Sequence, residues 1–199
     1  MSKRSKLILR ISLSGMFLAL AMVLPLLTGQ IPEIGQKLSP MHIPVLICGF
    51  ICGWPYGLAV GFFAPLLRFL IFGMPPIYPY GLAMAFEMAV YGLLTGILYV
   101  VFVKRNVNNL FAIYVTLIVS MLAGRMVWGV VRYLIAVLDG TMVFTFKMFM
   151  GGAFINAWPG IILHIILIPA ILLALDKANL LNKLNLPEEE ITFEEQEEK

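Results

Sequence analysis

Long apolar runs, interrupted by short polar breaks, make up most of this chain. The runs lie at about Leu7–Leu27, Met41–Gly53, Tyr56–Phe72, Tyr80–Val103, Leu110–Leu138 and 152–176. A helix that crosses a bilayer needs about 20 mostly apolar residues, so most of these runs are long enough to span a membrane. The second run is short, and the fifth is longer than a bilayer needs. The pattern predicts an all-α integral membrane protein, a bundle of about six transmembrane helices.

The polar segments divide the chain into three parts. Residues 1–9 form a basic N-terminus, residues 10–178 form the six-helix transmembrane domain, and residues 179–199 form an acidic tail with few apolar side chains. Such a tail cannot bury enough apolar surface to fold, so we expect it to be disordered. Within the transmembrane domain the longest breaks are Thr28–Pro40, Gly73–Pro79 and Asp139–Gly152.

Basic residues near the ends of the runs predict how the bundle is oriented. One side of the membrane would receive Lys3, Arg4, Lys6, Arg10, Lys104, Arg105, Lys177 and Lys183, and the other side only Lys37 and Lys147. Because cytoplasmic loops carry the excess of Lys and Arg, we expect both termini in the cytoplasm of a multi-pass cell-membrane protein. The three longest breaks then face outward.

Composition agrees with a protein that is solvated by lipid. Of the 199 residues, 61% are hydrophobic and 13% are charged, and the mean hydropathy is +0.95. Soluble domains have about 45–50% apolar and about 25% charged residues. No Lys/Arg stripe marks a soluble face, so nucleic acid is not an expected partner.

Sequence motifs for catalysis are missing from the chain. It has no G-x-x-x-x-G-K phosphate loop and neither an H-E-x-x-H nor a G-x-S-x-G motif. Cys48 and Cys52 lie four residues apart with only His42 nearby, which favours small packing residues over a metal site. We therefore expect no enzyme activity, no bound metal and no cofactor.

Four full charges lie inside the apolar runs, where they are costly. They are Arg68, Glu87, Arg125 and Arg132. A charge at the centre of a membrane helix costs about 2.5–3.5 kcal/mol on insertion scales, so such residues usually face a partner or a functional cavity.

Helical spacing places several of these charges beside aromatic and polar residues. Met121, Arg125, Trp128 and Arg132 share one face of the fifth span, Tyr80, Met84, Glu87 and Tyr91 share one of the fourth, and Asn156, Gly160 and His164 share one of the sixth. Small-molecule sites combine apolar walls with a few placed polar groups. We expect an outward-facing cavity lined by Glu87, Tyr91, Arg125, Trp128, Asn156 and Trp158, with Arg132, His42 and Arg68 as further substrate-binding candidates. Arg125 is the expected partner of an anionic group.

The residues leave alternatives open. Glu87 could neutralise Arg125 or Arg68 as a structural pair, and Arg68 and Arg132 could extend to the membrane surface. Trp128 and Trp158 could be packing or interface aromatics. His164 could be a hydrogen-bonded core residue, and His42 either a helix-end residue or part of the site wall.

Small residues four positions apart mark a second candidate surface. Gly15 and Ala19 show this spacing in the first span. In lipid, small residues allow helix backbones to approach closely. This face either packs inside the bundle or docks another membrane subunit.

Two longer stretches carry a family resemblance. HIPVLICGFICGWPYGLAVGFFAPLLRFLIFGMPP and YPYGLAMAFEMAVYGLLTGILY resemble the substrate-binding S components of energy-coupling factor (ECF) vitamin transporters. The similarity runs from about residue 10 to residue 176.

The resemblance implies a function and partners. Such a protein binds a vitamin or related micronutrient from outside, and the membrane domain would be the substrate-binding domain. It associates with a membrane coupling subunit and two cytoplasmic ATPase subunits, which power uptake. By this resemblance Gly15 and Ala19 would contact the coupling subunit, and the segment Thr28–Pro40 would gate the site.

The identity of the substrate stays open. Three intramembrane Arg residues against one Glu favour an anionic ligand, with pantothenate first. Riboflavin, folate, a thiamine or pyridoxine precursor and queuosine precursors remain alternatives. The rival functions are a non-transport membrane scaffold that recruits other membrane proteins and a small membrane enzyme.

Overall fold

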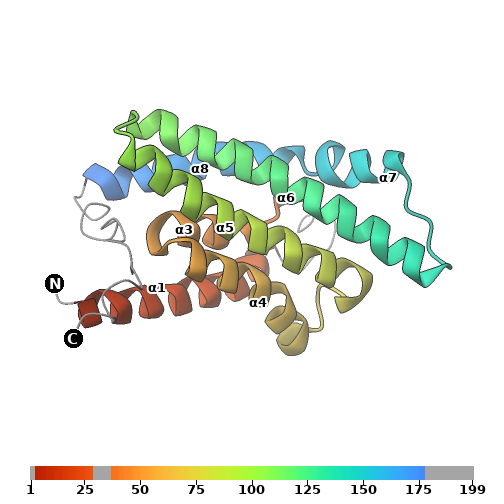
Figure 1. The fold of residues 1–199 in the computed structure, drawn as a ribbon. Coiled ribbons are helices and arrows are strands. Elements are labelled where there is room, and N and C mark those ends of the chain that lie inside the picture. The colour runs from red at the N-terminus through yellow and green to blue at the C-terminus, as the bar shows by residue number, and fades with distance from the viewer. Residues whose placement is uncertain (1–2, 29–36, 178–199) are drawn as a thin grey trace, which may run out of the picture.

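The structure is a computed structural model that describes residues 3–28 and 37–177. Every regular element in these two ranges is helical (Figure 1). The elements are α1 (Lys3–Val23), η1 (Leu24–Thr28), α3 (His42–Cys52), α4 (Trp54–Phe72), η2 (Ile77–Gly81), α5 (Leu82–Lys104), α6 (Asn109–Asp139), α7 (Phe146–Met150), η3 (Gly151–Ile155) and α8 (Trp158–Lys177).

The expected all-α membrane bundle is confirmed. Within the described residues, five helices are long and apolar enough to cross a membrane, and α3 is a shorter apolar helix. All eleven residues of α3 are buried, because α1, α4, α5 and α8 pack around it. Its run is short because it lies inside the bundle rather than along the bundle's full length (Figure 1).

Glycines let α4 and α5 pack with their backbones in contact. A Cβ atom on Gly57 would overlap the carbonyl of Gly92, and one on Gly61 would overlap the backbone of Met88. Gly49 of α3 meets the side chain of Thr95 in the same way. These small residues bring α3 and α4 against α5, which also packs on α6.

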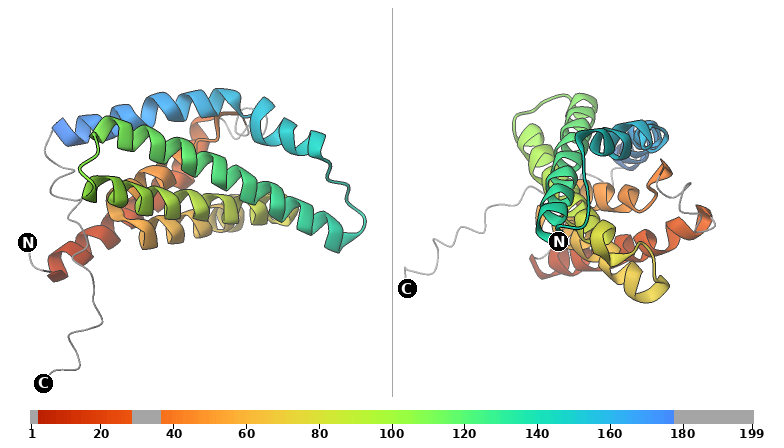
Figure 2. Two further views of the ribbon diagram at one scale, coloured as in Figure 1. Left: turned by 45° about the horizontal axis from the view of Figure 1, so that its top comes forward. Right: turned by 90° about the vertical axis from the view of Figure 1, so that its right-hand side faces the viewer.

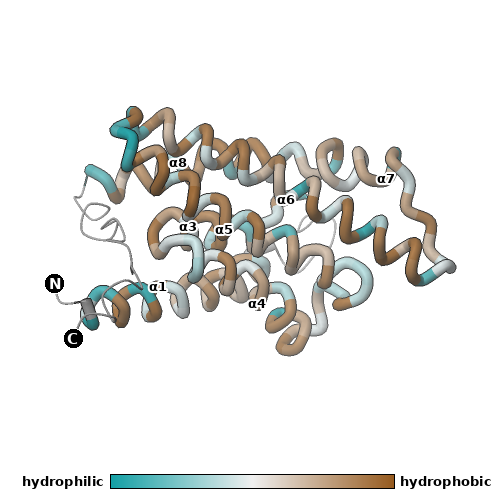
Figure 3. Tube along the Cα trace, viewed as in Figure 1, coloured by the Kyte–Doolittle hydropathy of each residue, from teal (hydrophilic) through white to brown (hydrophobic). Residues whose placement is uncertain are grey.

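Polar segments gather at one end of the bundle. The start of α1, the connection between α5 and α6, and the end of α8 form this end, while apolar residues dominate the helices between (Figure 3). We call it the Lys104 end. The opposite end, where α6 stops and α5 begins, is called the Asp139 end. With 31 residues, α6 is about 46 Å long, and its last turns extend beyond the neighbouring helices (Figures 1 and 2).

One predicted loop is partly wrong. Asp139–Gly152 was expected to lack regular structure, yet α7 lies within it and continues into η3. Thr145 caps α7 by accepting a hydrogen bond from the Met148 amide at 3.3 Å, and Phe149 packs where Gly129 of α6 leaves room. Most of the expected gating segment and the whole acidic tail lie outside the described residues.

Candidate functional site

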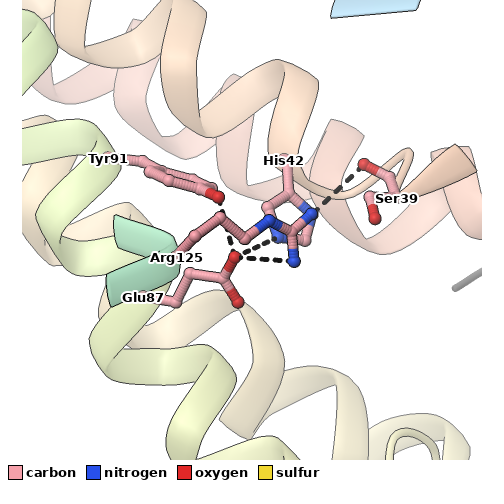
Figure 4. Close-up of polar contacts among 5 residues, drawn as sticks. All are labelled: Ser39, His42, Glu87, Tyr91 and Arg125. Carbon is pink, nitrogen blue, oxygen red and sulfur yellow. Dashed lines mark hydrogen bonds and ion pairs between the residues drawn. The ribbon is translucent and has the colours of Figure 1, made fainter. Parts of the chain in front are cut away.

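Glu87 of α5 is the centre of a buried polar cluster. Its Oε1 accepts a hydrogen bond from the Tyr91 hydroxyl at 2.7 Å and lies 3.0 Å from Nη1 of Arg125 on α6. Nε2 of His42, at the start of α3, lies 3.8 Å from the same oxygen. Figure 4 shows the three side chains converging on this carboxylate from three helices. The Glu87 side chain is 1% exposed, so these partners replace water around the charge.

Local packing brings the side chains of this cluster to within interaction distance of Glu87. Gly124 of α6 leaves the space that the Tyr91 ring fills, so the next residue, Arg125, reaches Glu87. His42 is oriented by its Nδ1, which lies 3.2 Å from the carbonyl oxygen of Ser39 just before α3. The cluster therefore depends on the small residue Gly124 and on the start of α3, which positions His42.

His164 of α8 completes the cluster. Its ring stacks near that of His42, with centroids 6.1 Å apart and planes inclined by 29°. His164 is 2% exposed, and its Nε2 has no hydrogen-bond partner among the described residues. We call His42, Glu87, Tyr91, Arg125 and His164 the Glu87 cluster.

The Glu87 cluster answers one question that the sequence left open. Glu87 neutralises Arg125, not Arg68. Because an unpaired buried charge is expensive and a hydrogen-bonded pair is tolerated, the pair accounts for two of the four intramembrane charges. The cluster offers no metal centre, since no group of three or more His, Cys, Asp and Glu side chains in residues 3–28 and 37–177 could hold an ion.

Arg132 of α6 has a different environment. It is 8% exposed, and its guanidinium carbon lies 4.3 Å from the ring centroid of Tyr80 and 5.4 Å from that of Phe144. Within the described part of the chain it makes no ion pair or hydrogen bond, and its Nε is a buried donor without a partner. In the part of the chain that the structure describes, no acid therefore compensates this positive charge below the surface of the fold.

Trp128 lies between the two arginines on the same face of α6. It stacks on Phe149 of α7 with centroids 6.4 Å apart and meets Phe144 edge-on at 5.8 Å. Gly152 leaves room for its indole ring. Trp128 thus joins α6 to the α7–η3 segment, as one of the packing alternatives anticipated.

Asn156 and Trp158 sit at the start of α8 but not in the Glu87 cluster. Both side chains are exposed, Trp158 at 60%. No hydrogen bond or ring contact of the described residues joins either one to Glu87 or Arg125. The structure therefore brings together four of the nine predicted substrate-binding residues, and places Trp128 and Arg132 further along α6.

Arg68 lies outside the Glu87 cluster, at the carboxyl end of α1. Its Nη1 donates to the carbonyl oxygen of Met22 at 2.7 Å, and its guanidinium carbon is 5.1 Å from the Phe72 ring centroid. Since Arg68 is 4% exposed, it does not extend to the surface. It caps the carboxyl end of α1, where the helix changes to the 3₁₀ turn η1, and a cation there interacts favourably with the helix dipole.

The sequence did not predict two features near Arg132. Tyr78 donates a hydrogen bond to Oδ2 of Asp139 at 2.6 Å, which ties η2 to the end of α6. Phe144 lies in a break that was expected to be an irregular loop. The sequence pointed to this region through Arg132 itself and through Tyr80 on the polar face of the fourth span.

The candidate docking residues of α1 are on its free side. Phe17 and Ala21 are buried against the bundle, whereas Gly15 and Ala19 are exposed. A Cβ atom on Gly15 would have no neighbour within 4 Å. Within residues 3–28 and 37–177, Gly15 therefore serves no close helix packing, and Ala19 is exposed.

Comparisons with known proteins identify the family. A family model for the substrate-specific component of ECF transporters matches residues 9–172. No curated protein and no solved structure gives a significant match. Proteins of this family are substrate-binding subunits rather than enzymes, and they work with a membrane coupling subunit and ATPases. The chain therefore belongs to the substrate-specific (S) components of energy-coupling factor transporters, and its role is to capture a small molecule for uptake.

Proposed function

We propose that this S component captures a small anionic micronutrient, a carboxylate vitamin such as pantothenate, and that Arg132 is the charge partner of that anion. The ligand would enter from the Asp139 end and be delivered inward by ATP-driven uptake. The observation that carries this proposal is that no acid in residues 3–28 and 37–177 pairs with Arg132, a cation that is 8% exposed.

The other intramembrane charges have partners. Arg125 is paired with Glu87 at 3.0 Å, and Arg68 is hydrogen-bonded to a helix carbonyl. Arg132 contacts only aromatic rings among the described residues. A buried charge is normally paired, so an arginine without an acid is suited to accept one from a ligand, by two parallel hydrogen bonds to a carboxylate.

The Glu87 cluster would form the polar floor of the same site. Arg125 and Arg132 lie seven residues apart on one face of α6, which corresponds to about 10 Å along the helix axis. A small vitamin is of this length. Its carboxylate would meet Arg132 while its polar groups reach His42 or His164, whose Nε2 atoms have no hydrogen-bond partner in the described ranges.

The orientation and the partner surface complete the proposal. Arg4, Lys6, Lys104, Arg105 and Lys177 gather at the Lys104 end, which favours a cytoplasmic location for that end and for both termini. We assign docking of the coupling subunit to the exposed Gly15/Ala19 face of α1, because small residues allow a partner helix to approach closely.

The experiment that tests the proposed ligand class has two steps. First, the detergent-purified protein is extracted and the extract is analysed by mass spectrometry for a bound small molecule. A membrane scaffold should carry none. Second, pantothenate, folate, riboflavin and thiamine are titrated against the parent protein and against Arg132→Met, with Tyr133→Leu as a matched control on the lipid-exposed side of α6.

We expect the parent protein to bind a carboxylate vitamin. Arg132→Met should lose about 10- to 150-fold in affinity, the equivalent of a hydrogen bond to a charged group, and Tyr133→Leu should bind as the parent does. Binding of only uncharged or cationic compounds, or an Arg132→Met protein with parental affinity, would contradict the anionic assignment.

A further inference from the structure

Arg132 is held by two aromatic rings that come from different segments. Tyr80 belongs to η2, which precedes α5, and Phe144 belongs to the stretch between α6 and α7. The guanidinium carbon lies 4.3 Å from the first ring centroid and 5.4 Å from the second. Both distances are within the roughly 6 Å range of cation–π attraction.

Arg125 and Arg132, which share one face of α6, are stabilised by different interactions. Arg125 faces a carboxylate, which cancels its charge and occupies an N–H group at 3.0 Å. An aromatic ring attracts a guanidinium through its quadrupole and has no net charge with which to cancel the cation. An aromatic ring also takes up none of the N–H donors of the guanidinium in a conventional hydrogen bond, whereas a carboxylate does.

We propose that Tyr80 and Phe144 are positioning residues for Arg132. Their rings stabilise the buried guanidinium in place of an acidic side chain, so its charge and its in-plane N–H groups stay available to the carboxylate of the ligand. This inference rests on the proposed function, because it concerns how Arg132 is kept ready for that anion.

Other contacts hold both rings in place. Phe144 also meets Trp128 edge-on, with centroids 5.8 Å apart. The segment that carries Tyr80 is tied to α6 by the hydrogen bond from Tyr78 to Asp139 at 2.6 Å. The Phe144 ring and the segment that carries Tyr80 are therefore tied to the helix that carries Arg132.

The acid closest in sequence to Arg132 is already engaged elsewhere. The Asp139 carboxylate accepts hydrogen bonds from the Tyr78 hydroxyl and from the backbone amide and hydroxyl of Thr141. It makes no ion pair with Arg132 among the described residues. Asp139 therefore places a carboxylate at the end of α6 that does not pair with Arg132, two turns earlier on the same helix.

The test compares ring removal with ring retention. Pantothenate and folate are titrated calorimetrically against the purified full-length protein, Tyr80→Leu, Tyr80→Phe, Phe144→Leu and Phe144→Tyr. Tyr133→Leu removes an exposed aromatic residue next to Arg132 in sequence and serves as the control. Tyr80 is 48% exposed, so its replacement should not prevent folding, which size-exclusion chromatography checks for every variant.

We expect Tyr80→Leu and Phe144→Leu each to weaken binding of the carboxylate vitamin by about tenfold. Tyr80→Phe and Phe144→Tyr should keep the parental affinity because the ring remains. In an Arg132→Met background, Tyr80→Leu should have no further effect, since the rings act through Arg132.

The outcomes separate this inference from the proposed function. If Arg132→Met loses affinity while both leucine variants bind as the parent does, the positioning role is overturned and the proposed function stands. Equal losses from Tyr80→Leu with and without Arg132 would also overturn it, because the ring would then act on the ligand or the fold directly. If neither vitamin binds the parent protein, or Arg132→Met binds with parental affinity, the proposed function fails first.

Discussion

Nη1 of Arg125 lies 3.0 Å from Oε1 of Glu87, and both side chains are withdrawn from solvent inside the helix bundle. The pair joins α5 to α6, the two helices that carry most of the candidate site. It also means that Arg125 has an acid partner, whereas no described acid neutralises Arg132.

The first prediction concerns this pair. Arg125→Met leaves the Glu87 carboxylate buried without its cation, so we expect it to destabilise the fold by about 3–5 kcal/mol. The double variant Glu87→Gln/Arg125→Met should be more stable than Arg125→Met alone, because no unpaired charge remains. Thermal denaturation in detergent measures both. An Arg125→Met protein of parental stability that has lost ligand affinity would instead make Arg125 the ligand's partner.

A second prediction concerns the end of α1. Arg68→Met removes the hydrogen bond to the Met22 carbonyl and the cation at the helix end. We expect a loss of about 1.5–3 kcal/mol, the range for hydrogen bonds to charged groups, again measured by thermal denaturation. Affinity for pantothenate in the folded variant should stay at the parental value, since Arg68 lies outside the proposed site. A selective loss of affinity would return Arg68 to the list of substrate-binding residues.

Backbone contact between α4 and α5 gives a third prediction. Gly92→Ala places a Cβ atom into the backbone of Gly57, so the helices must separate, at a cost of about 1–3 kcal/mol or more. Gly151→Ala is the matched control, because a Cβ atom there has no neighbour within 4 Å. We expect that control to be neutral or slightly stabilising in the same denaturation assay. Equal stability of the two variants would show that the helices do not approach as closely as described.

The proposed docking face on α1, at Gly15 and Ala19, gives a fourth prediction. Leucine at both Gly15 and Ala19 should abolish co-purification with the coupling subunit and ATP-driven uptake, because bulky side chains keep a partner helix away. Ligand binding by the isolated S component should persist, since a Cβ atom on Gly15 would have no neighbour within 4 Å among the described residues. The replacement of exposed Ile8 and Ile11 by leucine is a control on the same helix that introduces two leucines without adding side-chain bulk. A double variant that assembles and transports would rule out this face as the docking surface.

The parts of the fold that depend on local pattern were predictable from the sequence. Hydropathy located the spans, and helical spacing put Glu87 with Tyr91 on one face of α5 and Arg125, Trp128 and Arg132 on one face of α6. These relationships hold within a single helix, where 3.6 residues per turn fix which side chains are neighbours.

Contacts between helices could not be obtained in this way. Two relationships depend on how each helix is rotated in the bundle. One is the contact of His42 with Glu87, and the other is that Glu87 pairs with Arg125 and not with Arg68. The short helix α7 was missed because five residues do not form a stable helix by propensity alone. It is held by Phe149 against Gly129 and Trp128, and such packing has no local signature. The outward-facing cavity expected from the sequence, with Asn156 and Trp158 in its lining, stays a prediction.

The central claim, that a buried Arg132 recognises the anionic group of a micronutrient, is tested most directly by one pair of ligands. Pantothenate and pantothenol differ in having a carboxylate or an alcohol at the same position, so their affinity ratio isolates the charge. We predict that the parent protein prefers pantothenate by about tenfold or more and that Arg132→Met binds the two compounds equally. A parent protein without this preference, or an Arg132→Met variant that keeps it, would contradict the account.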